Sequence, residues 1–322
     1  MTAPLFPCEQ PSNSGPLFVV LNGASGRAAT EERQRLVSEQ FNAAGRGHEY
    51  LTVKSGRELP QVARRAVELA QRERGVVVAA GGDGTINAVA QEVLDYGLPF
   101  GVLPQGTFNY FGRANGISQD IATAARALVQ APVRPVQVGQ VNGHRFLVNA
   151  SIGLYPKLLE DREQWKRQYG RSRLVALGSA IATVLREHRR LNIELVRGEQ
   201  IRIIHATTLF VGNNALQLKQ LGLPEAERIE QGELAALALH PVSRLTMLWL
   251  MLRSAFGKLA DAEEVQRSAF RHMTVEPRLH YGSHRIKVAV DGEILWLRPP
   301  LHFEVAPHPL YLVAAEPTGP LE

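Results

Sequence analysis

The segment 76–90, VVVAAGGDGTINAVA, places the tightest constraint on the fold of this chain. Three valines and two alanines lead directly into two glycines, an aspartate, a glycine and a threonine. Apolar residues then recur at helical spacing from Ile86 to Leu94, and Gly97 and Pro99 follow as stop signals. A buried strand therefore turns into a helix at GGDGT. That connection is typical of the carboxyl edge of a parallel sheet, where α/β proteins bind ligands.

The 322 residues change in texture near residue 130, which favours two domains. Before that point short apolar strands alternate with helical patterns, as in an α/β domain with a parallel sheet. After it the sequence predicts a largely antiparallel β domain with hairpins at Asn142-Gly143, Gly198 and Asp291-Gly292, interrupted by helices near 156–188 and 242–257. Residues 1–15 are expected to form a disordered tail.

Composition is that of an ordinary soluble globular protein, with 45% hydrophobic and 21% charged residues. The single cysteine, Cys8, excludes an internal disulfide framework. No secretory signal is visible at the N-terminus, and the longest apolar run contains His240, Pro241 and Arg244, so we expect no transmembrane segment and a cytoplasmic location. The histidines show no zinc-ligand spacing, and nothing supports nucleic-acid binding.

Two further segments bear on a membrane role. Residues 162–190 contain eight Lys and Arg against Glu163 and Glu187, which predicts either a solvated helix face or a patch that holds the protein on anionic lipid. The apolar segment 245–257 is interpreted as core rather than as an interfacial contact.

The glycines of GGDGT are suited to phosphate binding. Gly81, Gly82 and Gly84 allow the backbone to approach a bulky anion, and the first turn of the following helix supplies N–H donors. Asp83 would repel a bare phosphate, so we expect it to hold Mg²⁺ or a ribose hydroxyl beside the phosphates. The alternative is a tight turn in which Asp83 only caps the helix.

Two more loops follow strands in the same way. NGASGR contains Asn22, Gly23, Ser25, Gly26 and Arg27, and PQGTFN contains Gly106, Thr107 and Asn109. The carboxyl ends of parallel strands meet at one edge, so the three loops together predict a site for nucleotide phosphates.

The order of these motifs, continued by NASIG at 149–153, VGNN at 211–214 and VDGE at 290–293, resembles the diacylglycerol kinase catalytic-domain family, which includes soluble bacterial lipid kinases and sphingosine kinases. The resemblance implies ATP-dependent, Mg²⁺-dependent phosphorylation of a lipid hydroxyl. It also implies an α/β nucleotide-binding domain over 16–132 with 302–316 returning to it, a β-sandwich lipid-substrate domain over 133–301, and a nucleotide in the cleft between the two domains. A peripheral position on an anionic membrane is expected, and a homodimer is left open.

Carried onto this chain, the resemblance makes Asp291 the general base on the acceptor hydroxyl and Glu293 part of the Mg²⁺ network together with Asp83. It assigns nucleotide binding to the three loops, through Asn22, Ser25, Gly26, Arg27, Gly81, Gly82, Asp83, Gly84, Thr85, Gly106, Thr107 and Asn109. From its own pattern alone, VAVDGEIL indicates merely a hairpin.

Two departures from the family pattern stand out. Gly23 replaces the frequent proline of the first loop, and Tyr110 stands where many members have an aspartate of the Mg²⁺ network. A nucleotide- or lipid-binding protein without catalysis therefore stays open. An NAD-kinase-like enzyme is the less favoured alternative, because the Asn-Glu pair and the Gly-Ser-Thr-Ala-Tyr-like segment of that class are missing.

Overall fold

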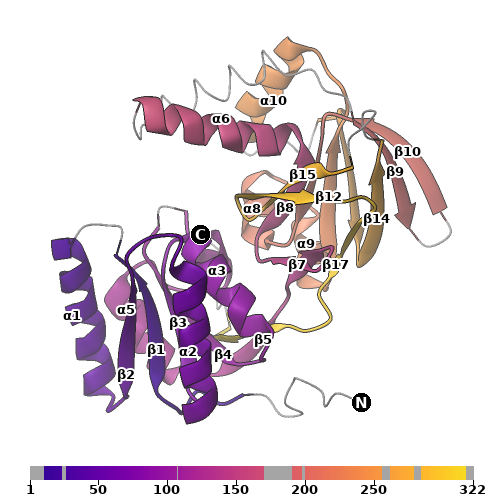
Figure 1. Ribbon diagram of the computed structural model, residues 1–322. Helices are drawn as coiled ribbons and strands as arrows, with labels where there is room; N and C mark the ends of the chain where they lie inside the picture. The colour runs from indigo at the N-terminus through magenta and orange to yellow at the C-terminus, as the bar shows by residue number, and fades with distance from the viewer. Residues whose placement is uncertain are drawn as a thin grey trace. The chain divides into compact units, whose positions relative to one another are not determined.

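The computed structural model describes residues 11–23, 27–106, 108–169, 191–197, 200–255, 262–278 and 284–316. The chain divides into two compact units (Figure 1). Unit 1 comprises Met1–Val138 and Pro307–Glu322, and unit 2 comprises Gly139–Ala306.

Unit 1 is built on a six-stranded sheet, sheet A, in the order β2-β1-β3-β4-β18-β5. Its strands run parallel except for β5, which is antiparallel to β18. The strands are β1 (Leu17–Asn22), β2 (His48–Val53), β3 (Val76–Gly81), β4 (Pro99–Pro104), β5 (Val133–Val136) and β18 (Leu310–Val313).

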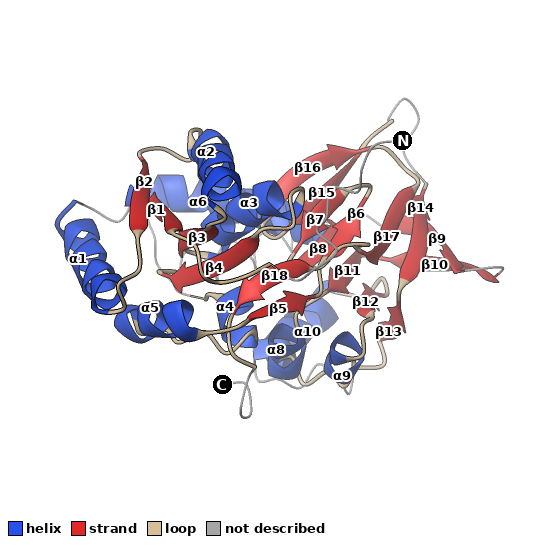
Figure 2. Ribbon diagram, turned by 90° about the horizontal axis from the view of Figure 1, so that it is seen from below, coloured by secondary structure: helices blue, strands red, loops and turns tan. Residues whose placement is uncertain are grey.

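Helices cover both faces of sheet A, with α1 and α5 on one side and α2 and α3 on the other (Figure 2). Every residue of β3 and β4 is buried, which explains why these strands read as continuous apolar runs rather than as alternation. The helices of unit 1 are α1 (Arg27–Ala43), α2 (Leu59–Glu73), α3 (Asp83–Leu94), α4 (Tyr110–Ala114) and α5 (Ile121–Gln130).

Unit 2 is a β-sandwich of two six-stranded antiparallel sheets. Sheet B has the order β10-β9-β14-β17-β6-β7, and sheet C has the order β13-β12-β11-β8-β15-β16. The strands are β6 (Gly139–Val141), β7 (His144–Phe146), β8 (Asn149–Gly153), β9 (Leu191–Arg197), β10 (Gln200–Ala206), β11 (Thr208–Gly212), β12 (Leu234–Leu239), β13 (Val265–Phe270), β14 (His272–Pro277), β15 (Ile286–Val290), β16 (Glu293–Leu297) and β17 (Leu301–Val305).

Apolar side chains from both sheets form one core, which includes Ile152, Leu209, Phe270 and Phe303. Helices α8 (Ala215–Gln220) and α9 (Ala226–Glu230) pack on the other face of sheet C, where Leu218 and Ile229 join Leu237 of β12. A further small cluster joins α6 (Leu154–Tyr169) to α10 (Arg244–Ala255). In the described part of the chain, no helix is long and apolar enough to cross a membrane.

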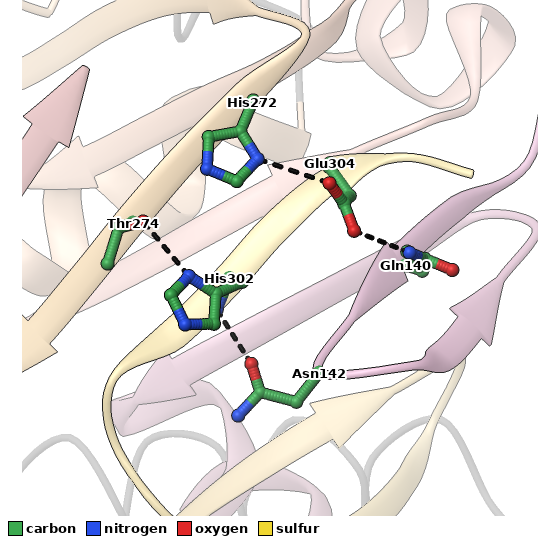
Figure 3. Close-up of polar contacts among 6 residues, drawn as sticks. All are labelled: Gln140, Asn142, His272, Thr274, His302 and Glu304. Atoms are coloured by element: carbon green, nitrogen blue, oxygen red, sulfur yellow. Dashed lines mark hydrogen bonds and ion pairs between the residues drawn. The ribbon is translucent and has the colours of Figure 1, made fainter. Parts of the chain in front are cut away.

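On the outward face of sheet B, polar side chains of β6, β14 and β17 contact one another (Figure 3). His272 of β14 contacts Glu304 of β17 at 3.1 Å, and Glu304 accepts a hydrogen bond from Gln140 of β6. Next to them, Thr274 and His302 are hydrogen-bonded at 3.0 Å. This alternation of a core face and a hydrated face is what the period-2 pattern of an antiparallel sandwich strand requires.

The α/β architecture followed by an antiparallel β region is confirmed, and so are the three hairpins. Both residues of the turns Asn142-Gly143 and Asp291-Gly292 have positive φ, as a type I′ turn demands. Strands β9 and β10 pair around 198–199, two residues that lie outside the described ones.

Some sequence expectations need correction. Residues 133–136 form β5 of unit 1 because they pair with β18, and the return to unit 1 begins only after β17. The predicted tail is held from Asn13 onward, since Arg46 donates hydrogen bonds to Asn13 and Gly15. The sequence analysis did not predict helices α8 and α9 or strands β13 and β14. These elements are short, so each contains too few residues to show a clear hydrophobic periodicity.

Candidate functional site

The glycine loops lie at the carboxyl edge of sheet A. Strands β1 and β3 are neighbours in the sheet, and their crossovers leave towards opposite faces. In doubly wound sheets this switch point is where ligands bind. Asn22 at the end of β1 donates a hydrogen bond to the hydroxyl of Thr85 in the first turn of α3, at 3.0 Å, and so ties the first loop to the second.

Glycine is required in these loops mainly because the chain approaches itself. A Cβ on Gly81 would lie 2.6 Å from the side chain of Thr85, and one on Gly106 would lie 2.8 Å from the Cα of Gly82. Gly84 differs, because it is exposed and a Cβ there would meet nothing within 4 Å. Space beside the loop therefore exists at Gly84, at the N-terminal turn of a twelve-residue helix.

Asp83 is not the helix cap. The N-cap of α3 is Gly82, and Asp83 is the first residue of the helix. Its Oδ1 instead accepts a long hydrogen bond from the backbone N–H of Phe111, at 3.4 Å, in the loop after β4. Burial raises the pKa of the Asp83 carboxyl, and the N–H groups of Phe111, Asn109 and Tyr110 offset part of that rise.

Asn109 holds the third loop in shape. It is buried, with φ of 47°, and its amide both accepts from Gly106 N–H at 2.9 Å and donates to Gly106 C=O at 2.8 Å. The same Nδ2 donates to Gln119 at 2.6 Å. These partners belong to the protein itself, so Asn109 stabilises the conformation of the third loop.

Tyr110 fills the position where the family often has aspartate. Its ring stacks on the exposed ring of Phe108, with centroids 5.8 Å apart and parallel planes. Burial raises the pKa of the Tyr110 phenol, Arg113 opposes the rise, and the charge of Asp83 adds to it. A neutral phenol therefore stands near Asp83 in place of a second carboxylate.

Some of the predicted loop residues lie outside the part of the chain that the structure describes. Ser25, Gly26 and Thr107 lie outside the described residues, and Arg27 opens α1 with its side chain outside them. The structure therefore brings together the rest of the set at one edge of sheet A: Asn22, Gly81, Gly82, Asp83, Gly84, Thr85, Gly106 and Asn109.

In unit 2, Asp291 lies at the turn of the β15–β16 hairpin and its carboxylate is firmly held. Oδ2 accepts the backbone N–H of Leu147 at 2.7 Å, and Oδ1 accepts those of Val148 and Asn149 at 2.9 and 2.8 Å. The Asp291 N–H donates to Asn149 C=O at 2.9 Å, which closes the arrangement. Three amide donors compensate a carboxylate charge and stabilise the ionised form.

Glu293, two residues on, opens β16 and is exposed. The amides of 147–149 were not among the predicted site residues, although NASIG begins at Asn149. Backbone donors leave no mark in side-chain identity, so only the placement of Asn149 beside the hairpin could have revealed them.

In the described part of the chain, no group of three or more His, Cys, Asp or Glu is arranged to hold a metal ion. The donor chemistry for Mg²⁺ is nevertheless present. Magnesium commonly takes one or two protein carboxylates and completes its shell with water and substrate phosphates. Asp83, a partly buried carboxylate in the first turn of α3, suits that use.

Comparison with known proteins places this geometry in context. Residues 16–141 match the family described as "Diacylglycerol kinase catalytic domain". The chain is 37% identical over 147 residues to a diacylglycerol kinase of Bacillus subtilis (strain 168), an alignment that covers 44% of this chain and 47% of that protein. The chain thus spans about half the length of this relative.

Two further similarities cover more of the chain. A Staphylococcus aureus (strain Newman) protein with the provisional name lipid kinase is 26% identical over 250 residues, covering 74% of this chain and 76% of that protein. The solved structure of a diacylglycerol kinase from Bacillus anthracis superposes with a TM-score of 0.68 at 17% identity, over 94% of this chain and 98% of that one. At that identity the structural match shows the fold alone.

Proposed function

Residues 16–141 belong to the diacylglycerol kinase catalytic domain family, and from this premise we propose that the protein is an ATP-dependent kinase that phosphorylates a hydroxyl of a membrane lipid such as diacylglycerol. The observation that carries the proposal is the edge of sheet A, where three glycine loops are tied to one another around the open position at Gly84.

The proposal assigns the nucleotide to unit 1. The N–H groups at the start of α3 and the space beside Gly84 suit the phosphates of ATP. Asn22 and Thr85 hold the first two loops at a fixed separation, and Asn109 fixes the third. A preformed cradle of this kind is what phosphoryl transfer asks of a protein, since the reaction depends mainly on positioning and charge neutralisation.

Magnesium is assigned to Asp83, with Glu293 as a second carboxylate in its network. When bound with ATP, the ion neutralises charge that develops on the phosphate oxygens. Burial raises the pKa of Asp83, which indicates that the carboxylate is short of compensating charge, and a cation supplies it.

Asp291 is assigned the acceptor hydroxyl. The three backbone N–H groups of 147–149 hold its carboxylate in one orientation. As a carboxylate, Asp291 can accept the hydroxyl proton of the lipid as the phosphoryl group transfers to the hydroxyl oxygen. The anchoring fixes its direction, so Asp291 contributes orientation as well as basicity.

A second candidate, nucleotide or lipid binding without catalysis, is favoured by two observations. Tyr110 replaces a carboxylate near Asp83, and three backbone N–H groups already engage the Asp291 carboxylate. We rank it second because the glycine loops and the Asp291 anchor are both built as the kinase reaction needs them.

The proposed partner is a lipid at an anionic membrane surface, approached by a cytoplasmic protein that associates peripherally. The basic stretch 162–190 is the expected contact, but residues 170–190 and the side chains of 162–169 lie outside what the structure describes. A homodimer stays open.

A labelled-ATP assay against a panel of lipids in mixed micelles tests the proposal. Diacylglycerol, monoacylglycerol, phosphatidylglycerol, ceramide and a sphingoid base all offer a hydroxyl, and NAD serves as the control for the NAD-kinase alternative. We expect Mg²⁺-dependent transfer of the γ-phosphate to at least one lipid. Tight ATP binding with no transfer to any acceptor would favour the binding protein.

A further inference from the structure

Helix α10 has apolar residues on two opposite sides. On its inner side Met247 and Leu250 are buried, and Met247 packs against Leu154 of α6. On its outer side Leu245 and Trp249 are 79% and 56% exposed. Residues four positions apart share a helix face, so these two large side chains form one patch pointing away from the core of unit 2.

An ordinary surface helix of this protein looks different. In α2, Ala66 and Leu69 face the core, whereas Arg64, Arg65 and Glu68 occupy the exposed side. The polar outer face of α2 is the usual result of amphipathic patterning. The sequence interpretation of 245–257 as core therefore holds for Met247 and Leu250 on the inner side of α10 but not for Leu245 and Trp249, and residues 256–257 lie outside the described ones.

The chemistry around the patch identifies what could cover it. Trp and Leu together are the side chains that enter the boundary between lipid headgroups and acyl chains. Arg244 and Arg253 stand in the first and last turns of α10, flanking the patch. Helix α10 itself contains no acidic residue. Exposed apolar side chains on a helix whose only charged residues are arginines match a negatively charged bilayer.

We propose that α10 is the docking helix of this protein, lying on an anionic lipid surface with Leu245 and Trp249 inserted among the lipids. The proposal rests on the proposed function, because a kinase that acts on a bilayer lipid has to reach it from the surface. It assigns the membrane contact to a defined face of unit 2 in addition to the basic stretch.

Vesicle binding tests this directly. Leu245→Asp and Trp249→Ala are compared with wild type for co-flotation with vesicles of phosphatidylglycerol and phosphatidylcholine. The matched control is Ile203→Asp on β10 of sheet B, because Ile203 is 57% exposed. We expect the two α10 variants to lower the partition coefficient about tenfold, the order expected when a large apolar side chain loses its transfer from water. The control should remain within about twofold. Equal losses in all three, or in none, would overturn the proposal.

A second measurement reports depth. With Trp165 and Trp296 replaced by Phe, the emission of Trp249 should shift to the blue on vesicle binding and be quenched by brominated lipids. Unchanged emission on vesicles that bind the protein would overturn the insertion. If Leu245→Asp instead abolished self-association measured by light scattering, and vesicle binding persisted, the patch would be an interface between copies of this chain.

The docking helix and the kinase activity can fail separately. Vesicle binding needs no ATP, so quenching of Trp249 without any phosphoryl transfer would leave the docking helix in place and remove the proposed function. With a dispersed short-chain acceptor, Leu245→Asp should keep wild-type kcat while losing activity on vesicles. Equal activity of Leu245→Asp and wild type on vesicles would contradict the docking role.

Discussion

Asp83 in unit 1 and Asp291 in unit 2 are both acidic residues at tight turns, but they receive very different support. Asp83 is partly buried, and burial raises its pKa although backbone N–H groups of 109–111, with Phe111 at 3.4 Å, offset part of the rise. Asp291 accepts three backbone N–H groups at 2.7 to 2.9 Å. An under-compensated carboxylate attracts a cation, whereas a compensated one is held in a fixed direction. This difference suits Asp83 to Mg²⁺ and Asp291 to the acceptor hydroxyl.

The largest effect is expected from Asp291→Asn. Loss of a general base lowers kcat by about 10²–10⁴-fold. The amide also points its NH₂ group at one of the N–H donors of 147–149, and an unsatisfied buried donor costs about 1–3 kcal/mol of unfolding free energy. Steady-state kinetics and chemical denaturation of the same preparation measure both. Near-normal turnover would show that Asp291 only anchors the loop.

The Asn142-Gly143 hairpin provides the control for that experiment. Asn142 also has positive φ, and its side chain makes three hydrogen bonds, to the backbone of Arg298, Pro300 and His302. Asn142→Ala should therefore lower the free energy of unfolding by about 1–3 kcal/mol, as Asp291→Asn does, while kcat per folded molecule is unchanged. A parallel loss of turnover in Asn142→Ala would mean that hairpin stability, and not the Asp291 carboxylate, limits the reaction.

Asp83→Asn should follow in size. The amide oxygen can still accept the Phe111 N–H, but the negative charge is gone, so the Mg²⁺ concentration needed for half-maximal activity should rise about 10–100-fold. Titration of activity and of ATP binding against Mg²⁺ measures this. Unchanged Mg²⁺ dependence would leave Asp83 as a clamp between two loops.

The stability of Asp83→Asn gives a separate check through pH. The pKa of Asp83 is higher in the folded state than in the unfolded state. The free energy of unfolding therefore falls as the pH rises from the unfolded pKa through the folded pKa, and the loss is complete above the folded pKa. The variant should thus be at least as stable as wild type near neutral pH, and the difference should vanish once the pH falls below the unfolded value of about 4. Thermal unfolding of wild type and Asp83→Asn at both pH values measures this difference in stability. A variant that is less stable than wild type at neutral pH would contradict the burial argument.

The glycines of unit 1 should separate into two classes. Gly106→Ala would place a Cβ 2.8 Å from the backbone of Gly82, which cannot give way easily, so a loss of about 1–3 kcal/mol is expected. Gly84→Ala meets open space and should leave stability within about 0.5 kcal/mol. If phosphates approach there, Gly84→Ala should raise the KM for ATP. The contrast fails if both variants change stability equally.

The smallest effect is expected from Glu293→Gln. Glu293 is exposed, so stability should stay within about 0.5 kcal/mol of wild type. Any rise in the Mg²⁺ requirement should remain below about tenfold, since solvent screens an exposed carboxylate. A loss of turnover as large as that of Asp291→Asn would move the central catalytic role to Glu293.

Sequence reasoning found the carboxyl edge of sheet A because its evidence lies in residue types. Glycines after buried strands, and helical spacing after them, predict both the turn and its place in the sheet. What the sequence did not reveal is why each glycine is needed. Gly81 and Gly106 serve contacts within the loops, and only their three-dimensional separation distinguishes them from Gly84.

The support for Asp291 could not be predicted in the same way. The Asp-Gly pair indicates a hairpin at once, but the donors come from backbone N–H groups some 140 residues earlier in the chain. Likewise, β5 was assigned to the wrong unit because VRPV resembles the β-rich segment that follows it, and only pairing with β18 from the end of the chain places it in sheet A. Long-range strand pairing decides which sheet such a strand joins, and the local sequence pattern does not reveal that pairing.

The central claim is that this chain transfers the γ-phosphate of ATP to a lipid hydroxyl, with Asp291 acting on the acceptor. The most direct measurement is mass-spectrometric detection of the lipid phosphate formed from ATP and diacylglycerol micelles by wild type, Asn142→Ala and Asp291→Asn at equal folded concentration. We predict product from wild type and Asn142→Ala at similar rates, and at least about a hundredfold less from Asp291→Asn. Equal product from all three would contradict the role of Asp291. Product from none of the three, with ATP binding intact and over the whole lipid panel, would contradict the kinase itself.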